Sequence, residues 1–268
     1  MITLGIRLYA LSAVALGVVG LRWGDFALQW QPVPPGVPGR TALAYLFAAA
    51  LVVSGAALNQ GRLARAGAAA LCALFGVAVL LHAPAVVTHP LVVGAWSGLA
   101  EQLALLSGAW LAFTMLSSPG RAGGRLRLGQ LAFGACPIAF GLAHFFYLDF
   151  TASLLPPWLP PGQLFWAAAT GVAHLAAGLA VLMRVRAHLA AVLLSIMFAL
   201  FGLLVHAPLL FADPASHLNW VMNAMNLALT GAACVLADSL SSRIMPARAD
   251  AARAPSVAGP APAGATRN

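Results

Sequence analysis

Long apolar stretches with very few charged side chains alternate along this chain with short polar segments. Each stretch has about the 20 apolar residues that a helix needs to cross the ~30 Å hydrocarbon core of a bilayer. Helices are expected because a chain in lipid must satisfy its backbone hydrogen bonds internally. The pattern predicts an all-α, polytopic membrane protein with eight transmembrane helices, at residues 3–22, 41–59, 66–84, 92–115, 128–147, 163–183, 188–209 and 218–237.

The two halves of the chain resemble each other. Leu-Leu-His-Ala-Pro around His82 returns as Leu-Val-His-Ala-Pro around His206, a shift of 124 residues, and the same shift carries Trp96 onto Trp220. Such self-similarity indicates a tandem duplication. Because each half has an even number of spans, we expect two parallel four-helix repeats related by a pseudo-two-fold axis along the membrane normal.

Breaks in composition give the domain boundaries. A segment rich in Pro, Gly and Arg separates the halves, and the last segment is too poor in large apolar residues to form a core. The first hydrophobic stretch could be read as a signal peptide, but its partner in the second half is internal, so we interpret it as a retained helix. We expect a first membrane repeat, a cytoplasmic linker, a second membrane repeat and a disordered basic tail at 1–116, 117–127, 128–238 and 239–268.

Composition and charge agree with this topology. The chain is 62% hydrophobic and 7% charged, whereas an ordinary soluble domain is about 25% charged. Its net charge of +8 comes from arginines that, apart from Arg22 and Arg40, lie on one side of the predicted topology. The positive-inside rule then places both termini in the cytoplasm. The use of Arg without Lys, with abundant Ala, indicates a bacterial genome of high GC content, and nucleic-acid binding is not expected.

Aromatic side chains gather in the connections that follow the first and fifth helices. Aromatic rings favour the headgroup zone of a bilayer, so an anchoring role is preferred over a ligand cage. The residues concerned are Trp23, Phe26 and Trp30 in one connection, and Phe145, Phe146, Tyr147, Phe150 and Trp158 in the other.

Polar residues inside the predicted spans are candidates for function, because they are costly in a bilayer. Glu101 lies roughly 14 Å along the fourth helix at 1.5 Å per residue, near mid-membrane, with Gln102 beside it. Asn219, Asn223 and Asn226 recur at spacings that place them on one face of the eighth helix. They could line a polar cavity or hydrogen-bond a neighbouring helix.

Four histidines add to this set. His144 and His174 could relay protons with Glu101, or could be buried neutral rings. The repeat-related pair His82 and His206 could bind haem, but each precedes Ala-Pro, which favours a cap at a helix end over an iron ligand. No zinc-ligand cluster, phosphate loop or Cys-x-x-Cys motif is found, so we expect no metal site.

A resemblance adds to these inferences. The segment from Gly141 through His144 and Phe145, followed by the Pro-Pro-Trp-Leu-Pro-Pro run around Trp158 and by glycines in the next helix, resembles the DoxX-like family of four-helix membrane proteins. The resemblance covers about one repeat, and in the first repeat Gly20 or Trp23 stands where His144 would fall. It implies a tandem DoxX-like protein of the bacterial inner membrane, in a family that includes subunits of quinone-linked oxidoreductases and redox-protective accessory proteins.

Three functions remain open from the sequence. The first is a membrane subunit or accessory factor of a quinone-linked or redox-protective system, with a redox enzyme as partner and a quinone as ligand, rather than an enzyme acting alone. The second is a transporter of small solutes or lipids with its site between the repeats. The third is a structural or chaperone-like membrane protein.

Overall fold

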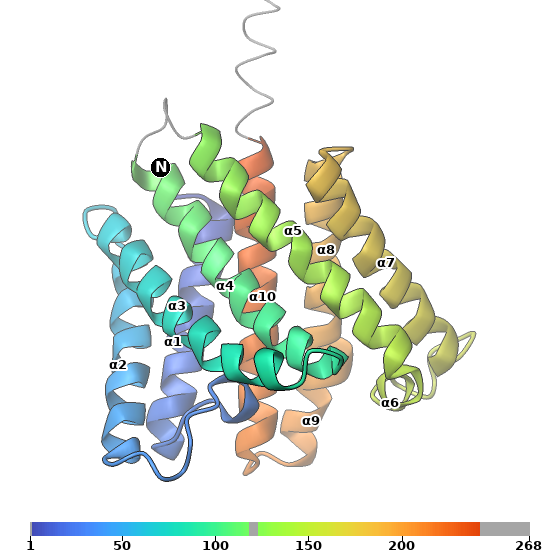
Figure 1. Cartoon of the computed structure of the whole chain (residues 1–268), viewed down its shortest axis with the longest axis horizontal. Coiled ribbons are helices and arrows are strands. Elements are labelled where there is room, and N and C mark those ends of the chain that lie inside the picture. The colour runs from blue at the N-terminus through green and yellow to red at the C-terminus, as the bar shows by residue number, and fades with distance from the viewer. Residues whose placement is uncertain (1, 118–122, 242–268) are drawn as a thin grey trace, which may run out of the picture.

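A computed structural model describes residues 2–117 and 123–241, and it contains helices and connections but no strand in those ranges (Figure 1). Two short helices lie in the connections, η1 (Leu28–Trp30) and α6 (Leu148–Ser153). The long elements are α1 (Leu4–Trp23), α2 (Arg40–Leu58), α3 (Ala64–Thr88), α4 (Val93–Ser117), α5 (Gly123–Phe146), α7 (Gln163–Met183), α8 (Ala187–Phe201) continued by the turn η2 (Gly202–His206) and α9 (Ala207–Ala212), and α10 (His217–Ser241).

Eight of these helical segments are long and apolar enough to cross a membrane, which confirms the expected number of spans. Their outer faces carry large apolar side chains: Leu80 is 70% exposed, Leu46 67% and Leu203 66%. A soluble protein rarely exposes apolar side chains over so much of its surface. The chain therefore has the build of a multi-pass membrane protein.

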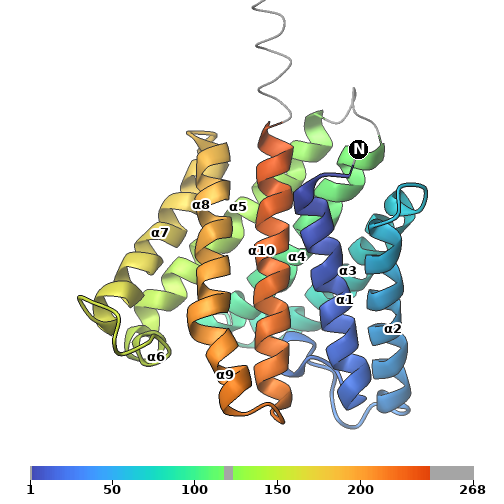
Figure 2. The same cartoon turned by 180° about the vertical axis from the view of Figure 1, so that it is seen from behind.

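Helices α4 and α10 form the centre of the bundle, and they are the most buried of the eight spans. They contact each other, α4 also packs on α3 and α5, and α10 also packs on α1 and α8. Helices α2 and α7 lie at the two flanks (Figures 1 and 2). The start of α1 and the end of α10 lie at the same end of the bundle, where the Asp238 carboxylate accepts hydrogen bonds from the Thr3 hydroxyl and the Gly5 amide.

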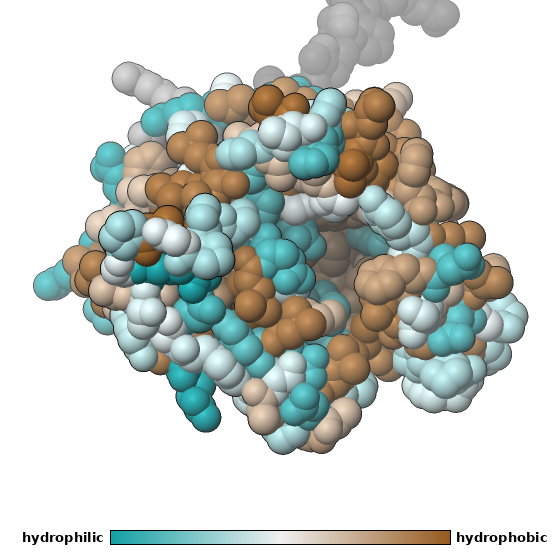
Figure 3. Space-filling model, turned by 60° about the horizontal axis from the view of Figure 1, so that its bottom comes forward, coloured by the Kyte–Doolittle hydropathy of each residue, from teal (hydrophilic) through white to brown (hydrophobic). Residues whose placement is uncertain are grey.

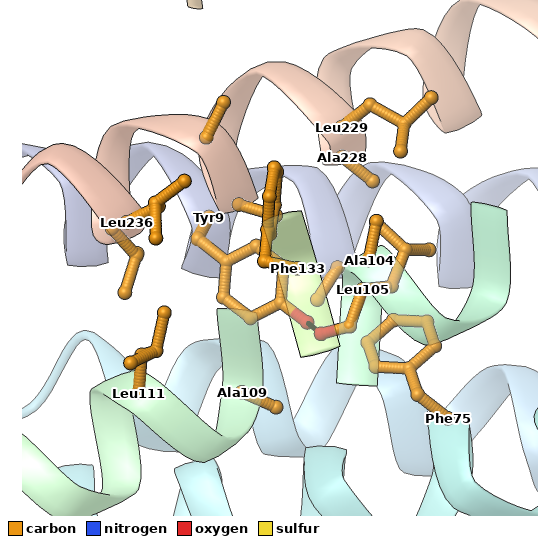
Figure 4. Close-up of a cluster of buried hydrophobic side chains, with 14 of the residues drawn as sticks. Tyr9, Phe75, Ala104, Leu105, Ala109, Leu111, Phe133, Ala228, Leu229 and Leu236 are labelled. Atoms are coloured by element: carbon orange, nitrogen blue, oxygen red, sulfur yellow. Dashed lines mark hydrogen bonds between the residues drawn. The ribbon is translucent and has the colours of Figure 1, made fainter. Parts of the chain in front are cut away.

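Tyr9 of α1 is a central residue of the apolar core (Figure 4). Its hydroxyl donates to the carbonyl oxygen of Leu105 on α4 at 2.6 Å, and its ring lies 6.2 Å from that of Phe75 on α3. Gly231 of α10 lets α1 approach, because a Cβ there would lie 2.7 Å from the Tyr9 Cα. Small residues at such contacts let membrane helices pack closely.

The two His-Ala-Pro segments do not end their helices, so the ends expected at residues 84 and 209 are too early. Helix α3 continues through Pro84 to Thr88, and the other segment continues through Pro208 to Ala212. Before Pro208 the helix widens into the π-helical turn η2, in which the Ala207 amide donates to the Gly202 carbonyl. A wider turn makes room for a proline ring that would otherwise clash with the preceding turn.

The expected domain limits differ in detail from the helix limits. Helix α5 begins at Gly123, so part of the expected linker is helical, and residues 118–122 lie outside the described residues. Helix α10 runs to Ser241, so the first residues of the expected tail belong to it, and 242–268 lie outside the described residues.

Of the expected anchors, Phe26 and Trp30 are buried in the protein, whereas Phe146, Phe150 and Trp158 are exposed.

Candidate functional site

Helices α4, α5, α7, α8 and α10 line an open cavity of about 330 Å³ that α6 borders, at the end of the bundle opposite the start of α1 and the end of α10. We call it the histidine cavity. Figure 3 shows this end of the molecule hollowed, with hydrophilic residues in the recess. Five of the residues proposed from the sequence as candidates for function line the cavity: Glu101, His144, His174, His206 and Asn226.

His144 on α5 and His174 on α7 form a pair of rings in this cavity. Their centroids are 4.8 Å apart. The Nδ1 atom of His144 lies 2.8 Å from the Phe140 carbonyl oxygen, and that of His174 lies 2.9 Å from the Thr170 carbonyl oxygen. Because a carbonyl oxygen can only accept, Nδ1 donates in both rings, and the Nε2 atom of each neutral ring is left as an acceptor.

Aromatic rings hold the histidine pair in place. Phe140 meets His174 edge to face at 5.8 Å, Phe198 lies 5.6 Å from His174, and Phe201 stacks on His144 at 6.3 Å. These phenylalanines also line the cavity. The walls are therefore apolar and flat, with the acceptor atoms of the imidazoles set among them.

Glu101 brings a carboxyl group to the same cavity from α4. It is half-buried, and the buried Trp30 of η1 lies beside its carboxyl group. Glu101 makes no ion pair with any residue in the ranges 2–117 and 123–241. The ion pair observed in those ranges joins Arg40 to Asp25. A carboxyl group without a cation inside a bilayer is costly, which marks a functional position.

His206 and Asn226 complete the polar wall from η2 and α10. The buried Nδ1 atom of His206 has no hydrogen-bond partner among the described residues. Nor does the Asn226 side chain make a hydrogen bond within the described ranges, although this residue is only 7% exposed. Unpaired polar groups at such depth are uncommon and need an explanation.

The asparagine stripe does not act as one unit. Asn219 donates to the carbonyl oxygens of Leu209 and Asp213, which closes the end of α9. Asn223 donates to the carbonyl oxygens of His206 and Asn219. Neither residue lines the histidine cavity. The stripe therefore divides between its two expected roles: Asn226 lines the cavity, whereas Asn219 and Asn223 bond backbone carbonyl oxygens.

Gln102 and His82 also lie outside the histidine cavity. Gln102 is 1% exposed, and its Nε2 atom has no partner among the described residues. Both ring nitrogens of His82 contact carbonyl oxygens, of Ala78 at 2.9 Å and of Gln29 at 3.2 Å. This bonding leaves no His82 nitrogen for iron, so it argues against a haem shared with His206.

Some contributors to the site were not found from the sequence. Trp30 had the signature of an interfacial anchor, and nothing in its spacing pointed to Glu101. Gly202, against which the Asn226 amide packs, is one of 26 glycines. Tyr147 also had the sequence features of an interfacial anchor. It borders the cavity, and its hydroxyl oxygen accepts a hydrogen bond from the Gly94 amide at 3.1 Å.

This arrangement suits a flat ligand that carries hydrogen-bond donors. Two imidazole Nε2 atoms and a carboxyl group can accept from hydroxyl groups and can take up their protons, while the phenylalanines pack against a ring. No group of three or more His, Cys, Asp or Glu that could hold a metal ion occurs in the described part of the chain. No family model matches the chain, and no curated protein or solved structure matches it.

Proposed function

We propose that this chain is a tandem DoxX-like membrane protein that serves as a subunit or accessory factor of a quinone-linked or redox-protective system, and that its histidine cavity binds the ring of a quinol. The single observation that carries this proposal is the pair of Nδ1-bound imidazoles in an aromatic cavity with Glu101. A quinol ring is flat and carries two hydroxyl donors, which is the complement of that site.

The size and chemistry of the cavity support this ligand class. Its volume of about 330 Å³ lies at the lower end of the range, about 300–1,000 Å³, that small-molecule sites occupy. The Nε2 atoms of His144 and His174 would accept hydrogen bonds from the ring hydroxyls, with Glu101 as a further acceptor; of the two protons released, one would pass to an imidazole and one to the Glu101 carboxylate. The electrons released when a quinol is oxidised would pass to a partner redox enzyme, since this chain supplies binding and proton uptake.

We also propose that the chain is built from two parallel repeats. In support, the shift of 124 residues carries the bounds of α4 onto those of α10. The indole of Trp96 donates to the Pro90 carbonyl oxygen and that of Trp220 to the Pro214 carbonyl oxygen, both at 2.9 Å. Helix α1 packs on α10 as α5 packs on α4, and α4 meets α10. A pseudo-two-fold axis between α4 and α10 accounts for these relations.

We infer a bacterial inner-membrane location with both described ends of the chain facing the cytoplasm. In support, the start of α1 and the end of α10 share one end of the bundle with the α2–α3 and α7–α8 connections (Figures 1 and 2). Those connections carry Arg62, Arg184 and Arg186. Accessibility of single cysteines at these positions to a membrane-impermeant thiol reagent tests the orientation: the proposal predicts labelling only after the membrane is opened.

Isothermal titration calorimetry of the protein in lipid nanodiscs tests the proposed ligand, with the tail-free ubiquinol ring as the probe. Wild-type protein should bind this ring, and His174→Phe should abolish the binding because it keeps a ring but removes Nε2. Gln102→Met, on the same bundle but outside the cavity, is the matched control and should bind as the wild type does. Absence of binding by the wild type would overturn the proposal.

A further inference from the structure

A second and larger hollow lies on the opposite side of α10 from the histidine cavity. It has a volume of about 830 Å³ between α1, α8, η2, α9 and α10, the helices that face the viewer in Figure 2. We call it the lateral groove. Its walls are mainly apolar and include Ala15, Val18, Leu203, Ala207, Leu210 and Leu227.

Most polar groups in the floor of the lateral groove are already satisfied. The Thr230 hydroxyl donates to the Asn226 carbonyl oxygen, and the Asn223 amide donates to the His206 and Asn219 carbonyl oxygens. The groove lies along spans apolar enough to cross a membrane, so hydrocarbon would fill it in a bilayer. It therefore suits the tail of a lipid-like molecule.

The Asn226 amide has no such partner, and it joins the two hollows. Its side chain lines both the lateral groove and the histidine cavity. It is 7% exposed and makes no side-chain hydrogen bond within the described residues, which is costly in an apolar setting. Asn226 thus stands at the boundary between hydrocarbon and the polar site, with an amide free to pair with a ligand.

Gly202 forms the other side of this boundary. A Cβ at Gly202 would lie 2.7 Å from the Asn226 Oδ1 atom, so the glycine is what lets the amide sit against α8. Gly202 is also the first residue of η2, where the backbone departs from the regular α-helical hydrogen-bond pattern. The Asn226 side chain closes the space between α10 and this backbone. We call this place of contact the Gly202–Asn226 window.

We propose that the natural ligand is a tailed quinol whose apolar tail occupies the lateral groove while its hydroxylated ring occupies the histidine cavity, with the Gly202–Asn226 window joining the two. This inference rests on the proposed function, and it adds that the quinol carries an apolar tail with a binding site of its own. The Asn226 amide binds the ring substituents where ring and tail meet. The ring reaches the cavity sideways from the bilayer, and movement of the Asn226 side chain opens the window.

Two probes separate this inference from the proposed function: the tail-free ubiquinol ring, and the same ring with a decyl tail. Their binding is measured in nanodiscs of one lipid composition. Gly202→Leu fills the window, and Leu227→Trp fills the groove from a position that does not line the cavity. Gly76→Leu is the matched control, because no atom lies within 4 Å of a Cβ there.

The inference predicts that Gly202→Leu and Leu227→Trp each weaken binding of the decyl-tailed probe by about tenfold or more, the consequence of overpacking. Leu227→Trp should leave binding of the tail-free ring unchanged. Gly202→Leu should weaken binding of both probes, because it displaces the Asn226 amide, and Gly76→Leu should leave both probes unchanged. Unaltered binding of the decyl-tailed probe by Leu227→Trp would overturn the inference while the proposed function stood. Failure of the wild type to bind either probe would overturn both.

Discussion

The imidazole rings of His144 and His174 lie 4.8 Å apart, and each donates Nδ1–H to the carbonyl oxygen four residues earlier in its own helix. This relationship sets the chemistry of the site, because it leaves two Nε2 acceptors among phenylalanine rings. Helices α5 and α7 pack along their length, so the pair sits at a fixed contact of the bundle.

Replacing His174 with Phe should remove ligand binding with little loss of stability. The new ring keeps the packing against Phe140 and Phe198, while the lost hydrogen bond to the Thr170 carbonyl oxygen costs about 1 kcal/mol. Thermal unfolding in detergent and calorimetric titration with the tail-free ubiquinol ring measure the two effects. Wild-type affinity in the Phe variant would show that the imidazole is not a ligand-binding group.

Glu101→Gln should reduce binding of the same ring by about tenfold while the fold persists. The amide keeps the shape of the side chain and an oxygen for Trp30, but it removes the carboxylate as a proton acceptor. The thermal midpoint should rise, since a carboxyl group without a cation is costly within a membrane. A large fall in the midpoint together with unchanged binding would assign Glu101 a purely structural role.

Gln102→Met should stabilise the protein. The Gln102 amide is buried with no partner for its Nε2 atom among the described residues, and an unsatisfied buried donor costs about 1–3 kcal/mol. Methionine has a similar length and can fill the same space without that cost. A higher midpoint of thermal unfolding with unchanged ligand binding is expected. A lower midpoint would indicate that the amide has a partner in the bilayer-embedded protein.

Asn223→Ala should destabilise the protein by about 1–3 kcal/mol, because the carbonyl oxygens of His206 and Asn219 lose their side-chain donor. Binding of the tail-free ring should not change, since Asn223 does not line the histidine cavity. Thermal unfolding and titration of the same sample test both statements. If the variant lost ligand binding but kept the stability of the wild type, Asn223 would be a ligand-binding residue.

The positions of the spans and part of the site could be predicted from the sequence for clear physical reasons. Apolar runs long enough to cross a bilayer form helices, because a helix satisfies its own backbone hydrogen bonds. A carboxyl or imidazole group inside such a run must face other helices. Glu101, His144 and His174 therefore could be grouped before their contacts were known. The same argument singled out Asn226, which lines both hollows.

The contacts of Asn219, Asn223 and Trp30 depend on local backbone geometry, which the spacing of residues along the sequence does not reveal. Asn219 and Asn223 share a face with Asn226, but η2 and α9 bring the carbonyl oxygens of His206 and Leu209 within reach of these two amides. Trp30 has the composition signature of a membrane anchor, yet the connection after α1 folds inward and buries it beside Glu101. Neither outcome could be read from periodicity alone.

The central claim is that the histidine cavity holds a quinol, and the most direct measurement is quantitative mass spectrometry of the quinones that copurify with the tagged protein from its native membrane in mild detergent. The account predicts about one quinone for each chain in the wild type and in Gln102→Met, and a loss of that quinone in His174→Phe. Equal amounts of quinone in all three proteins, or none in the wild type, would contradict it.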